Sequence, residues 1–157
     1  MAGYTFLFLI LLFQVSSSME LVDKFKFEFQ ETEIERESND LVSPQCMHCI
    51  CEVESNCQAI GCRMDVGSLS CGPFQIKKPY WIDCGMPGGD YQRCTTDYTC
   101  SYYCVQSYMA RYIGASGCPG NCESYARIHN GGPTGCRNRN TLGYWNKIMS
   151  KGCTPDS

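Results

Sequence analysis

Four stretches of the chain place apolar residues at helical spacing. The first begins at Ser43-Pro44, where proline suits the first turn of a helix, and runs to Cys57. Its apolar positions follow the i, i+3, i+4, i+7 pattern of an amphipathic helix: Cys46, Cys49, Ile50, Val53 and Cys57. Glu54 is therefore expected near the C-terminal end of this helix.

A longer central helix is expected after a capping residue at Thr96 or Asp97 and before Gly114. Its periodic positions are Cys100, Tyr103, Cys104, Ser107, Tyr108 and Tyr112. Between the first helix and this one, residues 65–76 are too rich in turn residues for a helix. They predict a small β-hairpin or irregular sheet.

Two shorter helices are expected towards the C-terminus. Asn121 opens one that Asn130-Gly131-Gly132 ends, and Thr141 opens another that Gly152 ends. The sequence therefore predicts an α+β domain that is mostly helical and has one small sheet.

The first 18 residues have the layout of a secretory signal peptide. An apolar run from Tyr4 to Phe13 precedes small polar residues, and cleavage is expected near Ser17 or Ser18. The run is too short for a permanent membrane-spanning helix, so an anchored N-terminus is the minor alternative. These features predict a secreted, extracellular protein without a permanent membrane anchor.

Residues 19–45 contain eight acidic and three basic residues and no cysteine, which is typical of an acidic pro-segment or flexible leader. The alternating Phe25, Phe27 and Phe29 leave a second interpretation open, a strand that docks on the domain as a temporary cover. Residues 46–157 carry ten Lys or Arg and eight Asp or Glu, whereas the whole chain has a net charge of −3. This small basic excess without a basic cluster argues against a nucleic-acid partner.

All 14 cysteines lie within residues 46–157, and an even number in a chain with an export signal predicts seven disulfides. Zinc is the alternative, because Cys46, Cys49 and Cys51 lie close together with His48 among them. Disulfides are favoured, and neither a metal nor an organic cofactor is expected. Spacing leaves the pairing open among Cys46, Cys49, Cys51, Cys57, Cys62, Cys71, Cys84, Cys94, Cys100, Cys104, Cys118, Cys122, Cys136 and Cys153.

Glu54 and Asp65 are the candidate catalytic pair. Hydrolysis of a glycosidic bond needs a protonated carboxyl that donates to the leaving oxygen and an ionised one across the sugar ring. Apolar Ile50 and Val53 would shield Glu54 from water, whereas Asp65 lies among polar residues. Taken alone, the two acids are more simply a solvated helix residue and a turn or cap residue.

Five long segments are distinctive in combination with the 14 cysteines: CMHCICEVES (46–55), CRMDVGSLSCGPFQIKKPYWIDCG (62–85), CVQSYMARY (104–112), ARIHNGGPTGC (126–136) and GYWNKI (143–148). In this order they resemble the invertebrate-type lysozymes, including the leech destabilase group. The resemblance implies a lysozyme-like fold and hydrolysis of the β-1,4 bond between N-acetylmuramic acid and N-acetylglucosamine in bacterial peptidoglycan. It implies that Glu54 is the proton donor and Asp65 the nucleophile or charge stabiliser. This division of roles is the known scheme of a lysozyme of another sequence class.

Binding of N-acetyl sugars requires a groove with aromatic faces and polar groups, and the expected partner is peptidoglycan or a chitin-like oligosaccharide. The candidate contacts are Lys77, Lys78, Pro79, Tyr80, Trp81, Ile82, Asp83, His129, Asn130 and Gly131. For Trp81 the alternative is packing in the core. For His129 it is a position at a helix C-terminus, where a positive charge complements the dipole.

Destabilase-like proteins are also associated with cleavage of γ-glutamyl-ε-lysine crosslinks, such as those in stabilised fibrin. The residues suggested for this activity have counterparts here at Ser68, Ser70, Lys77 and His129. A serine becomes a nucleophile only when a base lies within hydrogen-bond reach, here a desolvated lysine or the histidine. An isopeptidase acting on crosslinked fibrin is therefore the alternative enzyme. A non-enzymatic antimicrobial or carbohydrate-binding protein is the alternative outside catalysis.

Overall fold

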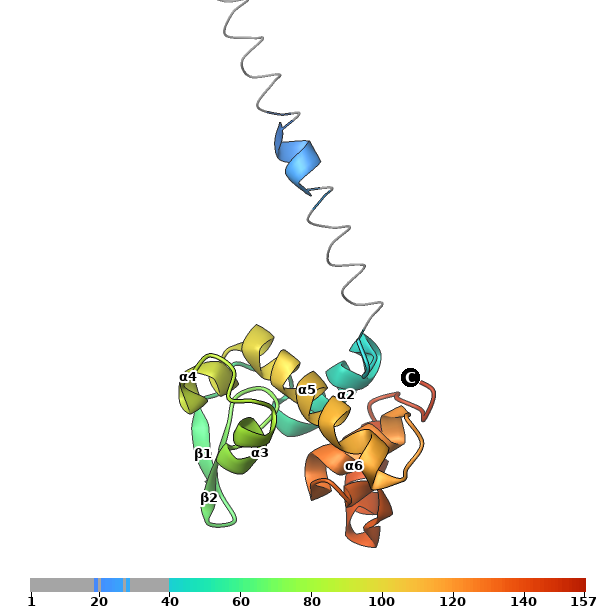
Figure 1. The fold of residues 1–157 in the computed structure, drawn as a ribbon. Coiled ribbons are helices and arrows are strands. Elements are labelled where there is room, and N and C mark those ends of the chain that lie inside the picture. Colours follow the sequence, from blue (N-terminus) through green and yellow to red (C-terminus); the bar gives the residue numbers. More distant parts are fainter. Residues whose placement is uncertain (1–18, 20, 27, 29–39) are drawn as a thin grey trace, which may run out of the picture. The chain divides into compact units, whose positions relative to one another are not determined.

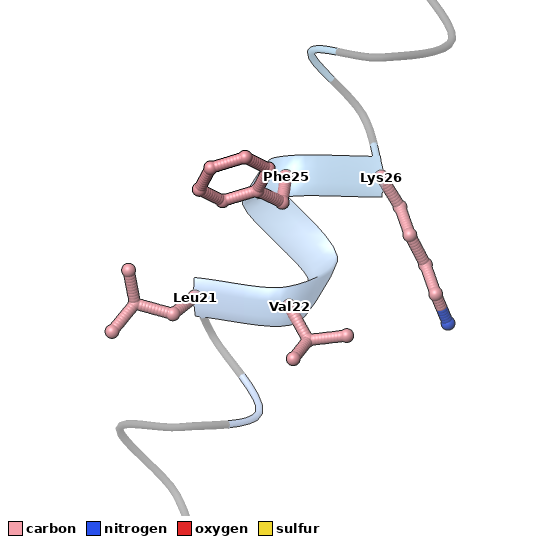
Figure 2. Close-up of a pocket in the computed structure, with 4 residues that line it drawn as sticks. All are labelled: Leu21, Val22, Phe25 and Lys26. Atoms are coloured by element: carbon pink, nitrogen blue, oxygen red, sulfur yellow. The ribbon is translucent and has the colours of Figure 1, made fainter.

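The computed structural model describes residues 19, 21–26, 28 and 40–157, and the chain divides into two units between residues 39 and 40. The predicted signal peptide at residues 1–18 lies outside the described residues. In the first unit, residues 21–26 are helical, and Leu21 and Phe25 point to the same side of this helix (Figure 2). Phe25 is therefore not part of a strand, while Phe27 and Phe29 lie outside the described residues.

The second unit combines helices with one three-stranded antiparallel sheet, which confirms the predicted α+β class (Figure 1). Its elements are α2 (Pro44–Ser55), β1 (Cys62–Asp65), β2 (Ser68–Cys71), β3 (Ile76–Lys77), α3 (Lys78–Asp83), α4 (Tyr91–Thr96), α5 (Tyr98–Ser116), α6 (Cys122–Gly131), the 3-10 helices η1 (Gly135–Arg137) and η2 (Arg139–Thr141), and α7 (Leu142–Met149).

The folded unit begins before Cys46. Val42 is fully buried, and the side-chain amide of Gln106 in α5 bonds to both the N–H and the carbonyl of Val42. Ser43 caps α2, because its hydroxyl accepts a hydrogen bond from the N–H of Cys46. Sequence composition places residues 40–45 in the acidic leader. In the structure they belong to the folded domain.

Side-chain caps begin the other long helices as expected. Asp97 accepts from the N–H of Cys100 at the start of α5, and Asn121 accepts from the N–H of Ser124 at the start of α6. These bonds satisfy backbone donors that have no partner within the helix. Thr141 precedes α7 but does not cap it with its side chain.

The observed helices differ from the predicted ones at three places. Helix α5 passes Gly114 and ends at Ser116, because an isolated glycine costs a helix only about 1 kcal/mol. Gly117, with φ of 68°, adopts the left-handed conformation that ends it. Helix α2 stops at Ser55, because Asn56 is already left-handed. Helices α3 and α4 have six residues each, too few to produce a visible period.

Strands β1 and β2 form the predicted hairpin. Its turn, Val66-Gly67, has positive φ at both positions, 44° and 77°, as the common two-residue hairpin turn requires. Arg63 lies opposite Ser70, which lies opposite Lys77 in β3. Because alternate residues of a strand share a face, Arg63, Asp65 and Lys77 emerge on one face of the sheet.

All the cysteines are paired, which confirms the seven disulfides and excludes the zinc alternative for Cys46, Cys49 and Cys51. The bridges are Cys46–Cys122, Cys49–Cys153, Cys51–Cys57, Cys62–Cys71, Cys84–Cys104, Cys94–Cys100 and Cys118–Cys136. They tie α2 to both α6 and the C-terminal segment. Within the described part of the chain, no helix has the length and apolar character needed to cross a membrane.

Loss of the Cys49–Cys153 bridge is expected to destabilise the protein more than loss of Cys94–Cys100. The first bridge spans 104 residues of the chain and the second spans 6. If crosslinks act by restricting the unfolded chain, they stabilise by about 4.7 and about 2 kcal/mol respectively. Urea unfolding of the two double cysteine-to-alanine variants measures this difference. Equal losses would contradict it.

Candidate active site

A cleft of about 690 Å³ lies in the second unit. The end of α2, the sheet, the start of α3 and the end of α6 supply most of its lining. The lining residues are Glu54, Arg63, Met64, Asp65, Val66, Ser70, Gln75, Ile76, Lys77, Pro79, Tyr80, Tyr108, His129, Asn130 and Gly132. Both candidate acids are among them.

Glu54 lies on the last turn of α2, and 18% of its side chain is exposed. The hydroxyl of Tyr144, from α7, donates a hydrogen bond of 2.7 Å to Glu54 Oε1. Nε2 of His129 lies 3.7 Å from the same oxygen. Both neighbours therefore contact one carboxyl oxygen, Oε1.

His129 is almost completely buried, with 4% of its side chain exposed. Its Nε2 lies 3.0 Å from the Phe74 carbonyl oxygen, and its Nδ1 lies 3.2 Å from the Tyr80 hydroxyl. Because a carbonyl only accepts, we assign the proton to Nε2, and Tyr80 then donates to Nδ1. Burial lowers the pKa of His129 and outweighs the opposing effects of Glu54 and the Phe74 carbonyl. His129 is thus a neutral residue that positions Tyr80, and not a cation that complements a helix dipole.

Two tyrosines beside Glu54 stay protonated and can act as donors. Burial raises the pKa of both Tyr80 and Tyr144, and the nearby Glu54 carboxyl raises each further. The ring of Tyr80 stacks on that of Tyr108, with centroids 3.5 Å apart and planes 10° from parallel. Because both rings line the cleft, they give it an aromatic surface.

Asp65 is the last residue of β1, and 54% of its side chain is exposed. Lys77 Nζ lies 3.0 Å from Asp65 Oδ2 and donates to the Asp65 main-chain oxygen, also at 3.0 Å. Lys77 thereby links β3 to the end of β1. The two acids have different surroundings, since Glu54 lies beside a phenol and a neutral imidazole and Asp65 beside an ammonium group.

The structure brings half of the expected substrate contacts into the cleft, namely Lys77, Pro79, Tyr80, His129 and Asn130. Trp81 is instead buried, packs on Tyr91 with ring centroids 5.9 Å apart, and donates its indole N–H to the Pro87 carbonyl. It therefore occupies the core, in agreement with the alternative interpretation. The other expected contacts outside the lining are Lys78, Ile82, Asp83 and Gly131. Because successive side chains of an α-helix point about 100° apart, only some of the side chains of α3 face the cleft.

Ser70, Lys77 and His129 line the same cleft, whereas Ser68 does not. Ser70 is only 2% exposed. The two bases suggested for a serine nucleophile are engaged by other groups, because Lys77 bonds to Asp65, and His129 bonds to Phe74 and Tyr80.

Sequence reasoning does not identify Tyr144, Tyr108 or Arg63 as site residues. Tyr144 contacts Glu54 from 90 positions away, and Tyr108 is indistinguishable from other apolar positions of its helix. Arg63 could have been found, because it lies two residues before Asp65 and alternation in a strand places both on one face.

Residues 43–151 match the Destabilase family. Lysozyme 1 of Crassostrea virginica is 62% identical over 116 residues, which cover 74% of this chain and 63% of that protein. Lysozyme of Magallana gigas is 60% identical over 116 residues, covering 74% of this chain and 85% of that protein. The crystal structure of Tapes japonica lysozyme matches with a TM-score of 0.72 and 55% identity, covering 74% and 97% of the two chains, which confirms the lysozyme-like fold. The chain therefore belongs to the Destabilase family, among the invertebrate-type lysozymes, a class of glycoside hydrolase.

Proposed function

We propose that the domain hydrolyses the β-1,4 bond between N-acetylmuramic acid and N-acetylglucosamine in bacterial peptidoglycan. Glu54 is the general acid, and Asp65 is the nucleophile or charge stabiliser. The observation that carries the proposal is that both carboxyls line one cleft, Glu54 shielded and Asp65 exposed. Glycoside hydrolysis needs two carboxyls in unlike surroundings, because one must carry a proton while the other is ionised.

One carboxyl oxygen of Glu54, Oε1, accepts a hydrogen bond from another side chain of the protein. Because Tyr144 donates to Oε1, that oxygen accepts, and the acidic proton is expected on Oε2. His129 is neutral and adds no positive charge beside the carboxyl. Oε2–H then donates its proton to the glycosidic oxygen while the bond from that oxygen to the sugar C1 breaks, so the leaving sugar departs as a neutral alcohol.

Asp65 supplies the negative charge that the reacting sugar requires. As C1 becomes positive, the carboxylate either bonds to it or stabilises it, and water then completes the hydrolysis with the Glu54 carboxylate as base. Lys77 holds Oδ2 and keeps the carboxylate in place on an exposed hairpin. The stacked Tyr80 and Tyr108 supply an apolar surface for a sugar ring of peptidoglycan or of a chitin-like oligosaccharide.

Export forms part of the proposal. Residues 1–18 act as a signal peptide, and the acidic leader is shortened from residues 19–45 to residues 19–39, because the second unit begins at Asp40. The seven disulfides support an extracellular location, because such bridges form and persist in oxidising compartments.

Glu54→Gln is expected to lower the rate of wall lysis by about 10²–10⁴-fold, because it removes the general acid. Reducing sugar released from a cell-wall suspension measures this rate. Glu52→Gln is the matched control, since Glu52 lies on the same helix but contacts His48 and Lys151. Undiminished sugar release by Glu54→Gln would overturn the assignment. Killing of bacteria without sugar release would instead indicate the non-enzymatic antimicrobial alternative.

Tyr144→Phe is expected to lower kcat about tenfold and to change KM less than about twofold, because Tyr144 orients the acid without contacting the sugar. Tyr125→Phe, a buried tyrosine of α6 outside the cleft lining, is the control. A raised KM with unchanged kcat would refute this role.

The alternative activity, cleavage of γ-glutamyl-ε-lysine crosslinks as in fibrin, has one observation in its favour, that Ser70 lies opposite Lys77 in the sheet. Because Lys77 and His129 are engaged elsewhere, we expect the native protein to leave a γ-glutamyl-ε-lysine dipeptide intact under conditions in which it lyses walls. Release of free lysine measures the activity. Release that persists in Glu54→Gln but disappears in Ser70→Ala would establish the isopeptidase.

A further inference from the structure

Arg63 is a charged residue of the cleft whose guanidinium has no ion pair or hydrogen bond among the residues that the structure describes. It is exposed and lies in β1, two residues before Asp65. Its cross-strand neighbour, Ser70, is small, buried and uncharged, so it does not hold the guanidinium by charge. Arg63 is thus available to a ligand.

The remaining charges of the cleft balance one another. Lys77 pairs with Asp65 at 3.0 Å. Glu54 is neutral in the protonated form that the proposed function requires, and burial keeps His129 uncharged. Arg63 is therefore the charge left over in the lining, and it attracts an anionic group into the cleft.

We propose that Arg63 binds a carboxylate of the substrate and makes the enzyme prefer peptidoglycan to neutral glycans. The inference rests on the proposed glycosidase function of the same cleft. The planar guanidinium presents paired N–H donors whose spacing matches the two oxygens of a carboxylate. Peptidoglycan carries carboxylates on the peptides attached to its muramic acid residues, whereas a chitin-like oligosaccharide carries none.

The exposure of Arg63 agrees with this role. Glu54, Tyr80 and His129 lie in the shielded part of the cleft, where the sugar rings would bind. Arg63 lies at its exposed side, on the hairpin, where a group that projects away from the glycan backbone would pass. Because Glu54 and Asp65 account for the bond that breaks in the proposed function, we assign Arg63 to a substituent of the glycan.

Kinetics on three substrates test the proposal: peptidoglycan, the same peptidoglycan with its carboxylates converted to amides, and a chitin oligosaccharide. Arg63→Gln should lower kcat/KM on native peptidoglycan about tenfold and leave the other two within about twofold. On native peptidoglycan, the kcat/KM of Arg63→Lys should lie between that of the native protein and that of Arg63→Gln, because lysine keeps the charge and loses the paired donors. High salt should reduce the difference in kcat/KM between the native protein and Arg63→Gln on native peptidoglycan, since an exposed ion pair is screened.

Arg139→Gln is the matched control, because it removes the same charge from an exposed position of η2 outside the cleft lining. Its kcat/KM should equal that of the native protein on all three substrates. An equal loss by Arg63→Gln on every substrate, or no loss on native peptidoglycan, would overturn the proposal.

Binding separates this inference from the proposed function. In the Glu54→Gln background, Arg63→Gln should weaken sedimentation with insoluble peptidoglycan about tenfold and leave binding to the amidated form unchanged. If the native protein cleaves none of the three substrates, the proposed glycosidase fails, and the binding result alone decides the role of Arg63. Equal binding with and without Arg63 would refute it.

Discussion

The orientation of the Glu54 carboxyl depends on how helix α2 is fixed to the C-terminal part of the domain. Cys46–Cys122 joins α2 to α6, and Cys49–Cys153 joins it to the segment after α7. The hydrogen bond from Tyr144 then reaches Glu54 across 90 residues of sequence. Because this bond needs α2 and α7 in their final positions, the acid is oriented only in the folded domain.

The acid on the sheet side of the cleft, Asp65, has surroundings opposite to those of Glu54. Asp65 is exposed and receives an ammonium group, whereas Glu54 is shielded and receives a neutral phenol. Lys77 thereby neutralises one carboxylate locally and leaves the charge of Arg63 unbalanced. The same few residues thus set the two acids apart and give the cleft its attraction for anions. In the proposed function, specificity and catalysis therefore depend on the same electrostatic arrangement.

The sequence predicts local features well because their causes are local. Capping by Asp97, the hairpin and the position of Glu54 at a helix end all follow from neighbouring residues. Contacts between distant segments have no such signal, so Tyr144 and the double engagement of His129 could not be predicted. Trp81 illustrates the same limit, because an aromatic residue beside a candidate groove looks identical whether it faces sugar or core. The family resemblance supplied the pairing of the acids that spacing alone could not.

The hairpin that carries Asp65 is crosslinked at its base, by Cys62–Cys71, while its turn projects into water with Val66 94% exposed. Few contacts restrain such a turn, so it deforms more easily than the disulfide-bound helices that carry Glu54. Lys77 restrains Asp65, the residue directly before this turn, through two contacts of 3.0 Å. Movement confined to Val66 and Gly67 therefore leaves the carboxyls of Glu54 and Asp65 in place.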